Sequence, residues 1–173
     1  MKKYSQSIVV LSLFLGLSAK AQVAIGKQAV TNSSVSLEFE TEARGIIMPW
    51  VEKEASVTNA VDGTIIFDVE TKDLKVKENG NWVNFTDGSA GQVDTTLQNG
   101  LTEKTDAKVS IGVPAVPAVP GILVLEDANK AMILPKTDSP HSSIVSPEPG
   151  TIVFDTVKQQ VAVFDGTKWT FWN

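Results

Sequence analysis

Gly63-Thr-Ile-Ile-Phe-Asp68 occurs a second time in the chain, as Gly150-Thr-Ile-Val-Phe-Asp155. The offset between the two copies is 150 − 63 = 87 residues, and it also places Trp82 on Trp169. A β-branched and aromatic run of this kind favours a β-strand. Self-similarity at a fixed spacing is the sequence signature of a repeat architecture. The stretch therefore indicates that the chain contains two copies of one β repeat unit.

The repeat extends over most of the chain. Upstream of the shared phrase the offset is 86, and it places Val23-Ala-Ile-Gly26 on Val109-Ser-Ile-Gly112. We therefore divide the chain into a first β unit at 22–86, a linker at 87–108 and a second β unit at 109–173. Each unit is close to the size at which a lone hydrophobic core is marginal. The two units are expected to share a core with each other or with another subunit.

Each unit is predicted to end in a three-stranded antiparallel meander. In the first unit the strands are Thr64–Phe67, Leu74–Glu78 and Trp82–Phe85. Asn79-Gly80 separates the last two, and Asn-Gly between alternating runs is a strong hairpin signal because both residues tolerate positive φ. Asp165-Gly166 is the predicted tight turn of the second unit. The fold class is all-β: two homologous units, each with short strands and a C-terminal meander.

The middle strand of the first meander alternates apolar and charged residues. Alternate residues of a strand share a face, so Leu74 and Val76 are predicted to face the core. Lys75 and Lys77 are then predicted to point to water.

The second meander is apolar on both faces. Ala162 and Phe164 stand where the first unit has its two lysines, and the last strand gains Phe171 and Trp172. Exposed apolar patches normally mark interaction surfaces. We therefore predict an interface at Ala162, Phe164, Phe171 and Trp172, buried against the first unit or against a second chain.

The first 21 residues read as an export signal. Lys2 and Lys3 precede an apolar run at Ile8–Leu17, and Ala19-Lys-Ala21 is a small-residue cleavage site. The apolar run is shorter than the roughly 20 residues that a bilayer-spanning helix needs. We expect an exported protein with residues 1–21 removed and no transmembrane span afterwards.

Charge and cysteine content narrow the class of protein. The chain has 15 Lys+Arg and 20 Asp+Glu. Cleavage after Ala21 removes three lysines and leaves 12 against 20, a net charge of −8. A nucleic-acid-binding protein would usually carry a basic patch, so no nucleic-acid partner is expected. The chain contains no Cys, so disulfides do not hold this exported fold.

The residues for catalysis or metal binding are sparse, so we predict no enzyme, no cofactor and no metal. His141 is the single histidine and is expected to be solvated in a Ser/Pro loop. Asp68 and Asp155 recur directly after a strand, which favours a turn-forming role over a carboxylate pair for glycosidase chemistry. Asp87-Gly-Ser and Asp165-Gly-Thr lack the oxygen density of a calcium loop and are interpreted as ordinary turns.

Tryptophans offer one possible ligand site. Trp82 and Trp169 are equivalent strand positions, which favours packing. Trp50 and Trp172 are less constrained, and a sugar-stacking site that uses them stays open as an alternative.

A Val-Pro stretch, Val113-Pro-Ala-Val-Pro-Ala-Val-Pro120, has a three-residue period. Proline fixes φ and favours an extended preceding residue, so this stretch is expected to be polyproline II-like. A strap over the unit's own core is favoured over a docking ligand.

The ordered pattern of both units resembles the repeats of exported, tail-fibre-like or adhesin-like surface proteins of Gram-negative bacteria. The pattern is Val-x-Ile-Gly, Lys/Arg-Gly-x-x-x-Pro, Gly-Thr-Ile-x-Phe-Asp and Asp-Gly-x-x-Trp. The positions that carry it are Val23, Ile25, Gly26, Arg44, Gly45, Pro49, Gly63–Asp68 and Trp82, and then Val109, Ile111, Gly112, Lys130, Pro135, Gly150–Asp155, Asp165, Gly166 and Trp169. The resemblance implies a fold and a surface context, and it names no ligand.

These observations predict a non-enzymatic structural or adhesive component of a bacterial cell-surface assembly. Its expected partners are itself, as a homo-oligomer, or other cell-surface proteins. The expected location is the cell surface, the extracellular space or the outer membrane, with the periplasm open. The alternatives are a monomeric binding module for a glycan or peptide and an accessory subunit of an outer-membrane or periplasmic complex.

Overall fold

The computed structural model describes residues 22–86, 92–96, 98–102, 104, 107–112 and 121–172. The predicted export signal, the Val-Pro stretch and the turn Asp87-Gly-Ser lie outside the described residues. No described helix is long and apolar enough to cross a membrane.

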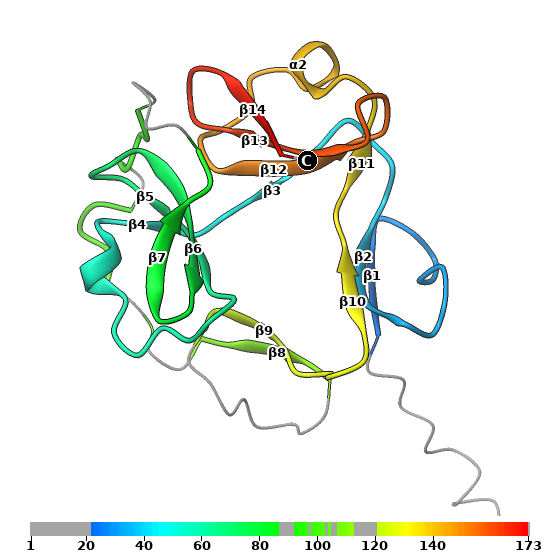
Figure 1. Ribbon diagram of the computed structural model, residues 1–173, viewed down its shortest axis with the longest axis horizontal. Helices are drawn as coiled ribbons and strands as arrows, with labels where there is room; N and C mark the ends of the chain where they lie inside the picture. Colours follow the sequence, from blue (N-terminus) through cyan, green and yellow to red (C-terminus); the bar gives the residue numbers. More distant parts are fainter. Residues whose placement is uncertain are drawn as a thin grey trace, which may run out of the picture.

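Strands dominate both units and follow the same order in each, which confirms the all-β prediction (Figure 1). The first unit contains β1 (Val23–Ile25), β2 (Val35–Phe39), β3 (Ile46–Ile47), β4 (Trp50–Val51), β5 (Ile65–Asp68), β6 (Asp73–Glu78) and β7 (Asn81–Asn84), with a 3₁₀ turn η1 (Glu54–Ser56). The second contains β8 (Val109–Ile111), β9 (Leu123–Leu125), β10 (Ala131–Ile133), β11 (Lys136–Thr137), β12 (Thr151–Asp155), β13 (Gln160–Phe164) and β14 (Trp169–Trp172), with a short helix α2 (Pro140–Ser143).

Both predicted meanders are present. β5, β6 and β7 form one antiparallel ladder, and β12, β13 and β14 form the other. A two-residue strand lies parallel to the first strand of each meander: Trp50 of β4 pairs with Phe67, and Lys136 of β11 pairs with Phe154. The two short strands follow Pro49 and Pro135, so they are themselves equivalent positions of the repeat.

The two hairpin turns differ. Asn79 has φ 50° and Gly80 has φ 75°, which confirms the two-residue turn between β6 and β7. The Asp165-Gly166 prediction needs correction, because Phe164 pairs with Trp169 and the loop therefore has four residues. The carboxylate of Asp165 accepts hydrogen bonds from the backbone N–H of Thr167 at 2.7 Å and of Lys168 at 2.8 Å. This side-chain contact holds the longer loop.

The N-terminal strands of each unit form a small parallel pair with the same register. Val23 of β1 pairs with Leu37 of β2, and Val109 of β8 pairs with Leu123 of β9. Both partners shift by 86 residues between the copies, so the repeat seen in sequence is also a repeat of strand pairing.

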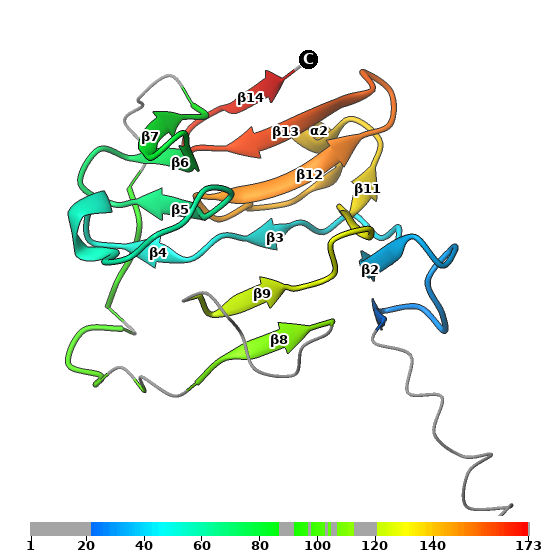
Figure 2. The same cartoon turned by 60° about the horizontal axis from the view of Figure 1, so that its bottom comes forward.

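Two strands cross from one unit to the other. β3 of the first unit adds to the edge of β12, where Thr151 pairs with Ile47 and Ile152 with Ile46. β10 of the second unit lies parallel to β2, with Met132 opposite Leu37. Figures 1 and 2 show β3 alongside β12, from where the chain continues to β4 of the first meander, and Figure 1 shows β10 beside β2. The two units therefore interlock through strand pairing.

The main core lies where the meanders meet β3. Phe67, Leu74, Ile152 and Val163 form its buried centre. The partly buried residues packed around it come from both units: Ile46, Met48, Trp50, Ile65, Val69, Phe85, Val93, Leu134 and Val161. The shared core agrees with the expectation that a unit of this size does not bury its apolar face alone.

The prediction that Lys75 points to water is wrong. Lys75 is buried, and its Nζ lies 2.9 Å from Asp68 Oδ2 and 2.8 Å from Glu54 Oε2. The alternation of the strand was correct, but η1 covers the lysine's side of the sheet and supplies Glu54. Lys77 is only half-buried, with its Nζ 5.2 Å from the centre of the Trp82 ring.

Candidate functional site

The four predicted interface residues lie on β13 and β14, the middle and last strands of the second meander. Ala162 pairs directly with Phe171, and Phe164 pairs with Trp169. Residues opposite each other on paired strands share a face, so Ala162, Phe164 and Phe171 lie together. Trp172 pairs with Val161 and therefore lies on the other face.

The shared face of Ala162, Phe164 and Phe171 is partly covered within the chain. Ala162 is fully buried, whereas Phe164 and Phe171 are half-buried. Phe164 packs at a tilt against Trp169, with ring centres 5.4 Å apart, and the Nζ of Lys158 lies 3.4 Å from the centre of the Phe171 ring. A role for this face in assembly stays a prediction.

Trp172 joins the second unit to the first. Its ring stacks on Phe85 with the ring centres 4.1 Å apart and the planes 17° from parallel. Its indole N–H also donates a hydrogen bond to the Phe85 carbonyl. Phe85 and Trp172 are equivalent positions of the repeat, so the stack joins the ends of the two meanders. Trp172 keeps 39% of its surface exposed.

Trp50 also spans the two units. Its indole Nε1 donates a hydrogen bond to the carbonyl of Pro149 at 2.8 Å, and its ring packs against the main core. A ligand that stacks on Trp50 would have to use the part of the ring left open by these contacts. The sugar-stacking alternative therefore rests more on Trp172 than on Trp50.

Phe85 is the contact residue that our sequence reasoning did not single out. The offset of 87 places it on Trp172, so the repeat itself contained the signal. Two aromatic residues at equivalent strand ends are natural stacking partners once the units pair.

The recurring aspartates act as turn formers, as predicted. Asp68 Oδ1 accepts from Thr71 N–H at 3.0 Å, and Asp155 Oδ1 accepts from Val157 N–H at 2.8 Å. Burial alone would raise the pKa of both carboxyl groups. Hydrogen bonds to the charged form outweigh that effect and hold both pKa values below the ordinary value. His141 is exposed on α2, which replaces part of the expected loop.

Glu38 of β2 holds the loop after β1 in place through hydrogen bonds from Lys27 and Thr31. Glu38 is buried, and its Oε1 lies 2.6 Å from Lys27 Nζ. Thr31 donates through its backbone N–H to Oε2 at 2.6 Å and through its hydroxyl to Oε1 at 2.7 Å. The hydrogen bonds from Lys27 and Thr31 lower the pKa of Glu38 to about 2.

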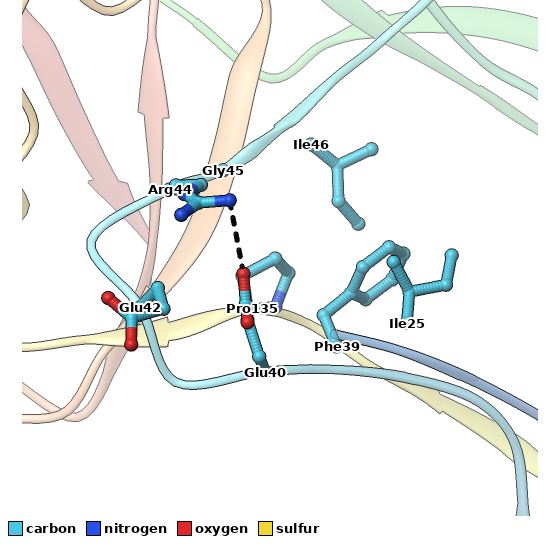
Figure 3. A pocket seen from close by; sticks show the side chains of 8 residues that line it. All are labelled: Ile25, Phe39, Glu40, Glu42, Arg44, Gly45, Ile46 and Pro135. Atoms are coloured by element: carbon cyan, nitrogen blue, oxygen red, sulfur yellow. Dashed lines mark ion pairs between the residues drawn. The ribbon is translucent and has the colours of Figure 1, made fainter. Parts of the chain in front are cut away.

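A pocket of about 290 Å³ lies where the first unit's small sheet meets β3 and the end of β10. Figure 3 shows an apolar wall of Ile25, Phe39, Ile46 and Pro135. Arg44 and Glu40 form an ion pair at 3.3 Å beside it. Within the described ranges, no group of three or more His, Cys, Asp or Glu side chains is placed to bind a metal. The pocket could bind an apolar group. Arg44 and Glu40 already neutralise each other's charge at its side.

Comparison with known proteins identifies one similarity. Residues 110–173 match the family model of the phage tail like trimerisation region. The match covers 173 − 110 + 1 = 64 residues, which is almost all of the second unit and less than half of the chain. No curated protein and no solved structure matches the chain significantly. The second unit is therefore similar to a region that trimerises in tail-like proteins.

Proposed function

We propose that this protein is a non-enzymatic structural component of a tail-fibre-like assembly on the bacterial cell surface, where it acts as a homotrimer. The observation that carries the proposal is the match of residues 110–173 to the phage tail like trimerisation region. The first unit repeats the same strands in the same order, so the proposal extends to both units.

The exposed apolar residues of the small sheets support self-association. Val23 and Ile25 of β1, Val109 of β8, and Ile122 and Leu123 at β9 are all exposed. Exposed apolar residues that cluster on one sheet are typical of protein interfaces. The net negative charge after signal cleavage makes adsorption to an anionic surface by charge a poor alternative.

Export and surface location rest on the leader-like first 21 residues and on the resemblance to surface repeat proteins. An adhesive role rests on that resemblance alone. We therefore propose a structural role first, with adhesion as a further property of the same assembly. Protease treatment of intact cells tests location: loss of the protein would support surface exposure, and its survival would favour the periplasm.

The alternative from a different class is a monomeric binding module for a glycan or peptide. The exposed part of Trp172 favours it, since an aromatic face next to solvent can stack on a sugar. An accessory subunit of an outer-membrane or periplasmic complex is the remaining alternative. Trp fluorescence that stays unchanged across a glycan panel would count against the binding module.

The deciding experiment is the absolute mass of residues 22–173 in solution, measured by size-exclusion chromatography with light scattering. A mass three times that of the chain, stable on dilution, would support the trimer. A mass equal to one chain would overturn the trimer and make the binding module the better proposal.

A further inference from the structure

The first strand of the second meander, β12, is paired with β3 along its outer edge. β3 lies along the N-terminal half of β12, and the backbone N–H of Met48 donates to the carbonyl of Gly150 at 3.1 Å. Gly150, Thr151 and Ile152 are all buried there. One strand taken from the neighbouring unit therefore completes this sheet.

The equivalent edge of the first meander is open. β4 reaches only Phe67 and Asp68 of β5, and no described strand pairs with the N-terminal half of β5 on that side. Gly63 is exposed, and Thr64 and Ile65 are half-buried, whereas their counterparts in the second unit are buried. The local turn is the same in both copies, since Thr64 N–H and Thr151 N–H each donate three residues back at 3.1 Å. The edge is built alike in both units, but among the described strands only the second unit has one that pairs with it.

The small sheets show the same asymmetry. β2 has β1 on one side and β10 on the other, and Leu37 is 1% exposed. β9 pairs only with β8 among the described strands, and its equivalent Leu123 is 46% exposed. Ser36 is fully buried, whereas its counterpart Ile122 is 61% exposed. Ile122, the more apolar of the two residues, is the one exposed to water within the single chain. Exposure of a large apolar side chain at this sheet edge suggests that a strand of another molecule covers it.

We propose that a second copy of this chain closes both open edges, head to tail, through the pairings that already join the two units. Shifting the observed registers by the repeat offsets gives the expected contacts. The partner's Thr64 and Ile65 would lie opposite Ile133 and Met132 of β10. The partner's Ile46 and Ile47 would lie opposite Leu123 and Val124 of β9. This proposal rests on the proposed self-association and specifies its surface.

The geometry requires a second molecule. β5 and β10 lie on opposite sides of the chain in Figure 1, so one chain cannot close its own edges. The interface joins different surfaces of two copies, and such a contact closes into a ring when the rotation allows it. Three copies in a ring would cover every open edge named above. Ala131 stands where the first unit has Gly45, the residue directly before β3, so the partner strand must accommodate one added methyl group.

Cysteine cross-linking tests the register, since the chain has no native Cys. Cα atoms of directly opposite residues in antiparallel strands lie about 4.5–5.5 Å apart, within the range that a disulfide bridges. The double variant Thr64→Cys/Ile133→Cys, oxidised under non-denaturing conditions, should give covalent multimers that dithiothreitol returns to monomers. Thr64→Cys/Val145→Cys is the matched control, because Val145 is exposed and belongs to none of the strands that the proposal pairs. It should stay monomeric on a denaturing gel.

A third variant separates the proposed arrangement from a strand exchange. Ile47 and Thr151 pair within one chain, so Ile47→Cys/Thr151→Cys should form an internal disulfide and run as a monomer. Intermolecular cross-links in this variant would mean that β3 of one chain pairs with β12 of another, and such a strand exchange overturns the proposed arrangement.

Light scattering on the same samples keeps the two proposals distinct. Multimers in solution without Thr64–Ile133 cross-links would refute the proposed edges and leave the trimer standing. A monomer in solution would refute self-association itself. Multimers that cross-link in Thr64→Cys/Ile133→Cys and not in its control would support both.

Discussion

Asp68 and Asp155 hold equivalent positions of the repeat, and their surroundings show how far the two copies have diverged. Asp68 Oδ2 accepts from Lys75 Nζ at 2.9 Å and from Glu54 N–H at 2.9 Å. Asp155 has Ala162 at the lysine's position, and its Oδ1 accepts from the backbone N–H groups of Val157 and Lys158. The first unit therefore stabilises its buried carboxylate by an ion pair, and the second relies on the turn.

Replacing Lys75 with alanine should destabilise the protein. Removal of one partner from a buried ion pair leaves an uncompensated charge and typically costs about 3–5 kcal/mol. Urea denaturation followed by Trp fluorescence measures the change in the free energy of unfolding. Lys77→Ala is the control and should cost less than about 1 kcal/mol. Asp68→Asn removes the carboxylate charge that Lys75→Ala leaves unpaired. The double variant Lys75→Ala/Asp68→Asn should therefore recover part of the lost free energy of unfolding. A Lys75→Ala cost no larger than that of Lys77→Ala would contradict this account.

Glu38 should make the protein sensitive to acid. Its pKa falls from 4.5 to about 2 on folding, so the folded state favours the charged form. The stability that this group contributes is present above pH 4.5 and is lost as the pH falls toward 2.

In Glu38→Gln the free energy of unfolding should therefore depend less on pH between 4.5 and 2 than in the wild type. Glu42→Gln, at an exposed position, should keep the wild-type slope. Chemical denaturation at stepped pH values gives both slopes. Equal slopes for Glu38→Gln and the wild type would refute the assignment.

At the scale of elements, the meanders were predictable because their signals are local. Strand alternation and Asn79-Gly80 specify the first hairpin without reference to distant residues. The placement of β3 on β12 was not predictable in the same way. Ile46–Ile47 reads as a short apolar strand, but strand pairing between units is set by the shared core rather than by adjacent residues.

Gly45 did carry a signal for that pairing. It forms part of the Arg-Gly-x-x-x-Pro motif, and a Cβ at this position would overlap Thr151 Cγ2 and approach Val153 Cγ1 at 2.9 Å. The glycine lets β3 approach β12 closely. The sequence showed the residue, and only the structure shows the strand that it faces.

Gly45→Ala should therefore weaken the contact between the units. Adding a methyl group to a well-packed site typically costs about 1–3 kcal/mol. The reverse substitution at the equivalent position, Ala131→Gly, should cost only about 0.5–1 kcal/mol, because it adds backbone entropy without a clash. Thermal unfolding of the two variants compares these costs. A Gly45→Ala variant as stable as Ala131→Gly would mean that β3 does not pack as described.

At the scale of the whole molecule, the candidate surface was only partly predictable. Faces within one strand follow from alternation, which placed Ala162 and Phe164 together. Trp172 lies on the opposite face from Phe171 because they are neighbours in β14, and it meets Phe85 of the other unit. That contact depends on how the two meanders are arranged, which no local pattern specifies.

The interlocked strands lead to a prediction for unfolding. β3 completes a sheet of the second unit and β10 completes a sheet of the first, so neither unit keeps its edges if the other unfolds. Leu74→Ala, a change at a fully buried position of the first unit, should cost about 2–5 kcal/mol. Hydrogen exchange measured by mass spectrometry should show β12 and β13 losing protection by the same amount as β5 and β6.

Self-association can be tested on the same two proteins by measuring their unfolding midpoints at different chain concentrations. For a trimer that unfolds to monomers, a tenfold rise in chain concentration stabilises the trimer by about 2.8 kcal/mol, twice the 1.4 kcal/mol of a tenfold equilibrium change. The unfolding midpoint of wild type and Leu74→Ala should therefore rise with concentration. A single cooperative transition with a concentration-independent midpoint would indicate two units interlocked within a monomer. Separate transitions for the two units would instead contradict the coupling through β3 and β10.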